Sequence, residues 1–318
     1  MLQPRLFLAA LLVSIGASAQ PYPSKPVRMV VAFPAGGIAD IYARIISARV
    51  AETWGQPVVV ENRTGAGGNI AAEHVARAAP DGYTLLMGNI GTHAVNVSLF
   101  AKLPFDPVKD FAPVAHVLEA EGLLVVHPSM PINSVADLVS QARANPGKLT
   151  FASAGMGTAS HLAGELFKAM AKVEMTHVPY KGNVPAITDL LAGQTSLLFA
   201  TMPTVLPHAK AGKLRAIATI GSARATATPE LPTIGESLPG FEVNNWIALF
   251  APTGTSSDIV KRWNAEVHRV MQSPDIQARL PNEGARFIPM APEQFGAFVK
   301  SEIAKWAPVV KASGARVD

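Results

Sequence analysis

Short apolar runs recur along the chain, and several are followed by a glycine-rich turn and then by apolar residues at helical spacing. This alternation limits the folds that the chain can adopt. Residues 27–33 form a largely apolar run, typical of a strand buried on both faces of a sheet. After the turn that follows, Ile38, Ile41 and Ile45 fall on one face at helical spacing, and Gly55 ends the helix. Strands alternating with helices imply a parallel sheet covered on both sides.

The same rhythm continues to the end of the chain. Further strands are expected at 58–60, 84–87, 123–126, 149–152, 176–178, 197–199, 214–220 and 245–250, and further helices at 70–79, 134–145, 158–171, 185–191 and 255–272. The last helix carries a core-facing stripe, which consists of Phe295, Val299, Ile303, Trp306 and Val310.

These elements predict an α/β fold of two domains, which form a clamp of the periplasmic-binding-protein kind. A length of 318 residues fits two domains at about 150 residues each. Each domain should hold a mostly parallel sheet flanked by helices. Because the C-terminal helices need a sheet to cover, we expect the chain to cross between domains twice, near 123–127 and 245–250. Domain I would then comprise residues 20–122 and 248–318, and domain II residues 123–247.

The first nineteen residues have the pattern of an export signal. Arg5 supplies a positive charge, residues 6–15 an apolar stretch, and Ala17-Ser18-Ala19 a cleavage site. We therefore expect cleavage after Ala19 and a periplasmic protein. No later apolar run approaches the roughly 18 to 20 residues that a membrane helix requires.

Composition and missing motifs exclude several classes of function. The chain has no cysteine, so it forms no disulfide and no thiolate site. Its formal net charge of +4 is mild and unclustered, which does not favour a nucleic-acid partner. The serine-hydrolase, zincin and P-loop signatures are missing, because no G-x-S-x-G or H-E-x-x-H occurs and both Gly-Lys pairs continue with Leu. We therefore expect no enzyme.

Two glycine turns, each at the start of a predicted helix, are suited to binding an anion. The first is Phe33-Pro34-Ala35-Gly36-Gly37, and the second is Ser153-Ala154-Gly155-Met156-Gly157-Thr158. A helix start exposes unbonded N–H groups at the positive end of its dipole, and glycine lets a ligand approach them. Two such turns in separate halves of the chain suggest a ligand held from both sides.

The residues near these turns have structural interpretations as well. Asp40 would offset the helix dipole and hold loop N–H groups. His161 and Glu165 form an i, i+4 pair, but a metal site needs three or four ligands, so no metal is expected. His161 could instead contact an acidic ligand. Gly155 and Gly157 imitate a dinucleotide motif whose third position is Ser160, so no cofactor is expected.

The strings along the chain resemble those of the Bug-type extracytoplasmic solute receptors of tripartite tricarboxylate transporters. They include Phe-Pro-Ala-Gly-Gly at 33–37, Val-Glu-Asn-Arg at 60–63, Gly-Ala-Gly-Gly at 65–68, Pro-Asp-Gly-Tyr-Thr-Leu-Leu at 80–86, Ser-Ala-Gly-Met-Gly-Thr-Ala-Ser-His at 153–161 and His-Val-Pro-Tyr-Lys-Gly at 177–182. They appear in order over essentially the whole chain after residue 19.

The resemblance implies a monomeric periplasmic receptor that closes on a small mono- or dicarboxylate and presents it to membrane permease subunits. Carried onto this sequence, it points to the carboxylate being held by Phe33, Pro34, Ala35, Gly36, Gly37 and Ile38, and by Ser153, Ala154, Gly155, Gly157 and Thr158, with His161 nearby. Asn89 and His93 lie just beyond a predicted strand, where ligands of open α/β sheets bind, and are weaker candidates.

The chain departs from the family pattern at two positions that are often acidic, which are Ser196 and Ala200 here. If Ala200 lines the pocket, the site there has less negative charge and more room, which would suit a bulkier or more acidic ligand. Ala200, Thr201 and Asn89 would then contact the part of the ligand beyond its carboxylate. Two alternatives to transport stay open at this point. The loaded receptor could signal to a membrane sensor kinase, or a hydrolase site could surround His161 and Glu165.

Overall fold

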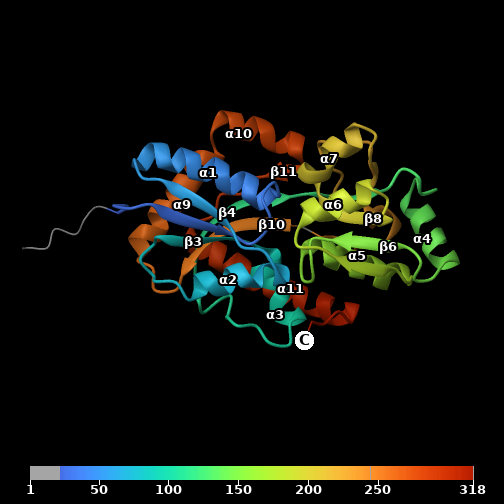
Figure 1. Ribbon diagram of the computed structural model, residues 1–318, viewed down its shortest axis with the longest axis horizontal. Coiled ribbons are helices and arrows are strands. Elements are labelled where there is room, and N and C mark those ends of the chain that lie inside the picture. The colour runs from blue at the N-terminus through green and yellow to red at the C-terminus, as the bar shows by residue number, and fades with distance from the viewer. Residues whose placement is uncertain (1–21, 244, 318) are drawn as a thin grey trace, which may run out of the picture.

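The computed structural model describes residues 22–243 and 245–317, which form two α/β units side by side (Figure 1). The expected export signal at 1–19 lies outside these residues. The first unit is built on a six-stranded sheet in the order β11-β4-β10-β3-β1-β2. Its strands are β1 (Val27–Val31), β2 (Val58–Asn62), β3 (Thr84–Asn89), β4 (Phe111–Ala120), β10 (Asn245–Pro252) and β11 (Ala285–Arg286).

Helices cover both faces of this sheet, and their apolar stripes supply its core. One face packs against α1 (Ile38–Trp54), α9 (Ser257–Met271) and α10 (Pro274–Arg279). The other packs against α2 (Asn69–Ala76), the short turns η2 (Gly91–Val95) and α3 (Asn96–Leu99), and α11 (Pro292–Ser313). The remaining short turns are η1 (Ala66–Gly68) and η3 (Leu280–Glu283). The C-terminal helices therefore cover the first sheet, as the sequence predicts.

The second unit holds a five-stranded sheet in the order β7-β6-β8-β5-β9. Its strands are β5 (Gly122–Val126), β6 (Thr150–Ser153), β7 (Thr176–Pro179), β8 (Leu197–Thr201) and β9 (Arg215–Thr219). One face packs against α4 (Val135–Ala144), α5 (Ala159–Ala171) and α8 (Ile234–Ser237), and the other against α6 (Asn183–Leu191) and α7 (Met202–Lys210).

The two-sheet α/β fold is confirmed, but the sheets are mixed where the sequence predicts mostly parallel ones. β1 pairs in parallel with β2 and β3, and β6 with β7 and β8. In contrast, β10 is antiparallel to both β3 and β4, and β5 to both β8 and β9. β4, β5 and β10 lie where the chain passes from one unit to the other. β10 runs opposite to β1, β2, β3 and β4, and β5 runs opposite to β6, β7 and β8, because neither strand enters its sheet through a helical crossover from a parallel neighbour.

Strand β4 is the largest element that the sequence pattern misses. It runs for ten residues between β10 and the two-residue edge strand β11, yet Pro113, His116 and Glu119 interrupt its apolar pattern. β4 ends at Ala120 and β5 begins at Gly122, so the chain passes from the first sheet to the second at Glu121. β10 belongs to the first sheet from Asn245 onward.

Most predicted helix starts and core positions agree with the structure. Ser134 Oγ accepts a hydrogen bond from the Asp137 amide at 3.0 Å, so Ser134 caps α4 as predicted. The predicted stripe on α11 faces the core, with Phe295 fully buried and Ile303 partly buried. Within the described part of the chain, no helix combines the length and the apolar character that a membrane crossing requires.

Candidate functional site

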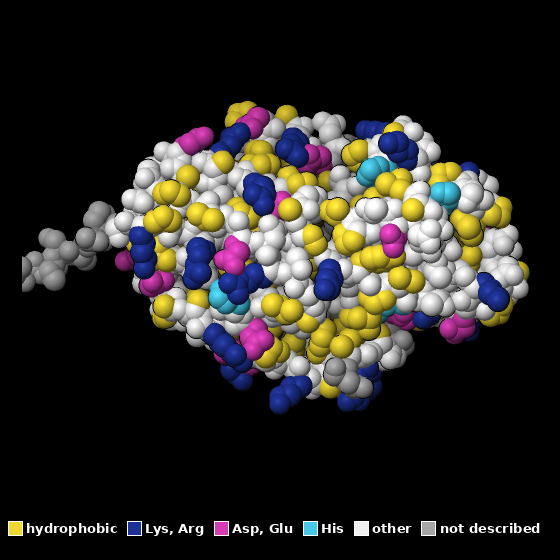
Figure 2. Space-filling view, viewed as in Figure 1, with side chains coloured by type: hydrophobic (Ala, Val, Ile, Leu, Met, Phe, Trp, Pro, Cys, Tyr) yellow, Lys and Arg dark blue, Asp and Glu magenta, His cyan; other side chains and the backbone are white. Residues whose placement is uncertain are grey.

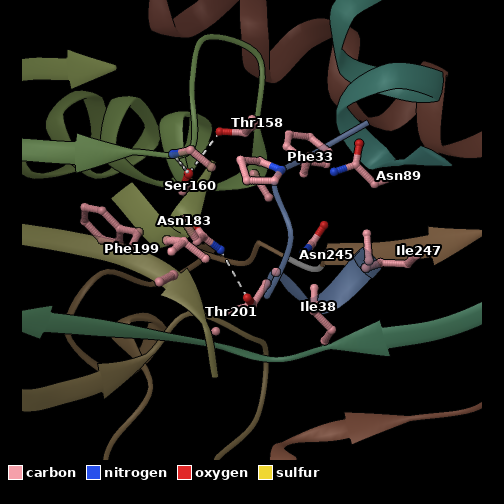
Figure 3. Close-up of a pocket in the computed structure, with 18 of the residues that line it drawn as sticks. Phe33, Ile38, Asn89, Thr158, Ser160, Asn183, Phe199, Thr201, Asn245 and Ile247 are labelled. Carbon is pink, nitrogen blue, oxygen red and sulfur yellow. Dashed lines mark hydrogen bonds between the residues drawn. The ribbon is translucent and has the colours of Figure 1, made fainter. Parts of the chain in front are cut away.

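A cavity that is partly open to solvent lies where strand ends of the two sheets meet (Figure 3). It lies at the carboxyl ends of the parallel strands β1, β3, β6 and β8, the usual ligand position in open α/β sheets. Nine predicted residues line it. They are Phe33, Pro34, Gly37, Ile38 and Asn89 from the first unit and Ala154, Thr158, Ala200 and Thr201 from the second.

The first glycine turn positions the N-terminus of α1 at this cavity. Gly37 is the N-cap residue in extended conformation (φ −76°, ψ 162°), and it has no side chain with which to cap the helix. The first-turn amides of a helix have no partner within it, and they lie at the positive end of its dipole. Because Ile38 and Ala39 line the cavity, this uncapped helix start is placed to bind an anion.

Asp40 stabilises the same turn through hydrogen bonds outside the cavity. Its carboxylate accepts hydrogen bonds from the Gly36 amide at 3.0 Å, Arg44 Nε at 3.0 Å and Asn62 Nδ2 at 2.9 Å. Burial by itself raises the pKa of Asp40, but these donors outweigh it and hold the pKa below its ordinary value. The ionised carboxylate therefore stabilises the loop, and it is not among the cavity-lining residues.

The backbone amides of the second glycine turn donate mostly to side chains of the same segment. The Ala154 amide donates to Ser160 Oγ at 2.8 Å, Gly155 to Ser153 Oγ at 3.0 Å, and Gly157 to His161 Nδ1 at 3.2 Å. Thr158 caps α5 by accepting from the His161 amide at 3.4 Å. These amides are therefore engaged within the protein, and the turn contributes Ala154, Thr158 and Ser160 to the cavity lining.

Two histidines support this turn from inside the protein. His161 stacks on His177 with ring centroids 4.4 Å apart, and His177 Nε2 lies 2.6 Å from Ser153 Oγ. Burial lowers the pKa of His161 to about 4 and that of His177 to about 3, so both are neutral near pH 7. Glu165 pairs with Lys168 at 3.0 Å. Among the described residues no cluster of metal-ligating side chains occurs.

Seven residues predicted for the site lie outside the cavity lining: Ala35, Gly36, His93, Ser153, Gly155, Gly157 and His161. His93 stacks on Phe250 at 3.6 Å inside the core, where complete burial lowers its pKa to about 3. The others belong to the two turns but contact the protein, because the amides of Gly36, Gly155 and Gly157 bond to neighbouring side chains.

Several lining residues have no strong signal in the sequence pattern. Asn183 begins α6, and Asn245 begins β10 on the opposite side of the cavity. Phe199, Ile220 and Ile247 add apolar walls. For Asn183, the available hint was its place directly after Gly182, where a helix starts. Among the residues that the structure describes, no charged side chain lines the cavity.

The units also touch at the rims of the cavity. A Cβ on Gly182 would lie 2.4 Å from Pro34 Cδ, and one on Gly157 would lie 2.0 Å from Asn96 Oδ1. Glycine is therefore required at both contacts, and both residues have positive φ.

Two sheets with a cavity between them are the arrangement of two-domain solute-binding receptors, and comparison with known proteins identifies the family. A family model described as the tripartite tricarboxylate transporter family receptor, TctC, matches residues 42–315. Protein BugT of Bordetella pertussis is 37% identical over 314 residues, which span 98% of this chain and 96% of BugT. The chain belongs to this family of Bug-type TctC receptors, which are solute-binding proteins and not enzymes.

Solved structures of relatives agree closely with this fold. An R. palustris protein solved with adipate has a TM-score of 0.90 at 39% identity, covering 93% of this chain and all 100% of its own. MatC from Rhodopseudomonas palustris, solved with bound malate, has a TM-score of 0.87 at 39% identity, with 91% and 100% covered. The periplasmic binding protein BugD has a TM-score of 0.88 at 34% identity, with 93% and 99% covered.

The surface of the molecule carries charges of both signs. Figure 2 shows Lys and Arg side chains scattered among Asp, Glu and apolar groups over both units on the face in view. This distribution agrees with the mild, unclustered charge that the sequence indicates.

Proposed function

We propose that the protein is a monomeric periplasmic receptor that captures a small carboxylate between its two units and delivers it to the membrane permease subunits of a tripartite transporter. The observation that carries this proposal is the uncapped start of α1 at a cavity that no charged side chain of the described residues lines. Family membership and the adipate- and malate-bound relatives support the same ligand class.

The proposed ligand position assigns different tasks to the two turns. The first-turn amides of α1 hold the carboxylate, and Asn89, Ala200 and Thr201 contact the rest of the molecule. The second turn carries Thr158 and closes over the ligand with its unit. We propose residues 20–122 with 248–318, and residues 123–247, as the two domains of this clamp, a division that differs from that between the two sheets only at Gly122 and at residues 245–247.

The energies available are sufficient for a useful affinity. A micromolar site needs about 8 kcal/mol of binding free energy. Hydrogen bonds to charged groups contribute roughly 1.5 to 3 kcal/mol each. A few amide donors from α1, together with apolar contacts to Ile38 and Phe199, therefore reach this range after the cost of closing the clamp.

A thermal-shift screen of purified residues 20–318 tests the binding part of the proposal. A ligand that binds only the folded protein raises its melting temperature. We expect aliphatic carboxylates to raise it, and neutral sugars and divalent metal ions to leave it unchanged. A sugar or metal that stabilises the protein while every carboxylate fails would contradict the proposal. Delivery is tested by carboxylate uptake in cells that carry the permease subunits with and without this receptor.

A further inference from the structure

Two buried oxygens at the cavity have no hydrogen-bond partner among the described residues. They are Oδ1 of Asn183 and Oδ1 of Asn245, and both residues line the cavity. Asn245 is only 7% exposed. Figure 3 shows the two carboxamides reaching the same space, Asn183 from the start of α6 and Asn245 from the start of β10. A buried acceptor without a partner is unfavourable, so a ligand that donates a hydrogen bond to it gains affinity.

A chain of hydrogen bonds fixes which end of the Asn183 carboxamide is left over. Thr204 Oγ donates its hydrogen to the Thr201 carbonyl at 2.8 Å. The hydroxyl of Thr201, 3.3 Å from Thr204 Oγ, must therefore be the donor in that contact. Thr201 Oγ is then the acceptor for Asn183 Nδ2 at 3.2 Å. The amide nitrogen thus faces Thr201, and the oxygen remains for a ligand.

The hydroxyls of the second turn are committed in the same way. Thr158 Oγ donates to the Gly155 carbonyl at 2.7 Å. Ser160 Oγ, 2.9 Å from Thr158 Oγ, must then donate to it, while accepting from the Ala154 amide. The hydroxyl hydrogens of Thr158, Ser160 and Thr201 are therefore used within the protein. The side chains of the second unit offer this part of the cavity acceptors more than hydroxyl donors.

This polarity restricts the ligand. A second carboxylate beside the Asn oxygens would place acceptor against acceptor. An ammonium group would supply donors, but no Asp or Glu of the described residues lines the cavity to balance its charge, and Ala200 stands at a wall position. A hydroxyl group supplies a donor without a charge.

Resting on the carboxylate function proposed above, we infer that the receptor selects hydroxycarboxylates: the carboxylate binds at the start of α1, and a hydroxyl of the same molecule donates to Asn183 Oδ1 or Asn245 Oδ1. A site built to bond a hydroxyl discriminates strongly against an analogue that lacks it, because its own polar groups are then left unpaired.

Matched ligand sets measured by isothermal titration calorimetry test this selectivity. One set is succinate, malate and aspartate, a second is glutarate, 2-hydroxyglutarate and glutamate, and a third is butyrate, 3-hydroxybutyrate and 3-aminobutyrate. Each set keeps the chain length and changes only hydrogen to hydroxyl to ammonium. In the set whose length fits, we expect the hydroxy acid to bind roughly tenfold or more tightly than either partner.

Substitution of the two asparagines tests their role. In Asn183→Leu or Asn245→Leu, the advantage of the preferred hydroxy acid should fall to less than about threefold, while the unsubstituted acid keeps its affinity. Asn133→Leu, at an exposed position before α4, is the control and should change nothing. The melting temperature of each unliganded variant verifies folding, and half-buried Asn183 offers the milder change.

The possible outcomes distinguish a failure of hydroxyl selection from a failure of the proposed carboxylate binding. Equal affinities within every set that binds, or tighter binding of the amino acid or unsubstituted acid, overturn hydroxyl selection and leave carboxylate binding intact. A hydroxyl preference that survives both substitutions overturns the assigned asparagines. Failure of all nine acids to bind overturns the proposed function and this inference together.

Discussion

The two glycine turns look alike in sequence, but they differ in what holds their backbone. The turn before α1 has no side-chain cap. The Asp40 carboxylate accepts a hydrogen bond from the Gly36 amide, and Asp40 lies outside the cavity lining. The turn before α5 is bonded through Ser160, Ser153 and His161 to its own amides. A glycine-rich helix start is therefore open to an anion only where neighbouring side chains leave its donors free.

The second turn has a different task, which is contact between the units. Gly157 packs against Asn96, which is buried and anchored by a 2.6 Å hydrogen bond from its Nδ2 to Asn69 Oδ1. Gly91 and Gly67 also approach the backbone of this turn closely. In our proposal the first turn binds the carboxylate, and the second turn holds the two units together in the closed clamp.

The largest effect should come from adding one methyl group to the second turn. In Gly157→Ala the new Cβ would lie 2.0 Å from Asn96 Oδ1. The closed arrangement would become rare, and carboxylate affinity should fall roughly 100-fold, in proportion to the lost closed fraction. Isothermal titration of the wild type and the variant measures this change.

Gly147→Ala is the matched control for this substitution. Gly147 has φ +71°, close to the +80° of Gly157, but a methyl group there would meet no atom of the described residues within 4 Å. Both variants carry the backbone strain of about 1 kcal/mol, and only Gly157→Ala carries the clash. Equal affinities for the two variants would show that the second turn takes no part in closure.

The next effect concerns the amides at the start of α1. Proline is tolerated at the first position of a helix and removes only an N–H that the helix does not use. Gly37 has an extended conformation, as the residue before proline requires. Ile38→Pro should therefore weaken carboxylate binding roughly tenfold more than Ile38→Ala does, because a hydrogen bond to a charged group is lost.

Ile38→Ala corrects for the loss of the buried side chain, which both substitutions share. Circular dichroism and the melting temperature verify that α1 persists in both. If proline and alanine weaken binding to the same extent, the Ile38 amide does not hold the carboxylate.

Local patterns in the sequence predicted local structure well. Residues 38–54 form a helix because isoleucines at helical spacing precede a glycine that adopts positive φ at Gly55. Ser134 caps α4 for the equally local reason that its hydroxyl reaches the Asp137 amide. Such signals need only neighbouring residues.

Features that depend on distant contacts were not predicted. β4 has no apolar alternation, because it is buried between β10 and β11 and covered by helices from the end of the chain. Asn183 and Asn245 meet at one cavity although 62 positions of sequence separate them. The bonding of Gly157 to His161 likewise depends on a side-chain rotamer, which spacing alone does not determine.

The smallest expected effect is a difference between the two turns in how their contribution to folding stability depends on pH. Burial holds the pKa of His161 near 4, below about 6.5 in an unfolded chain. The unfolded state then binds more protons between these values, so stability falls as the pH drops from about 6.5 toward 4. The lowered pKa of Asp40 means that its contribution is lost only below about pH 4.

Acidification from pH 6.5 to 4.5 should therefore weaken the second turn and leave the first intact. His161→Asn keeps an acceptor for the Gly157 amide but does not titrate, so its melting temperature should fall less steeply over this range than that of the wild type. The difference is at most about 1.4 kcal/mol of stability per pH unit for one histidine. His177, His93 and His116 also have lowered pKa values and keep part of the slope in the variant. If the melting temperatures of the two proteins fall equally with pH, the pKa of His161 does not differ between the folded and unfolded states, and the predicted role of His161 is wrong.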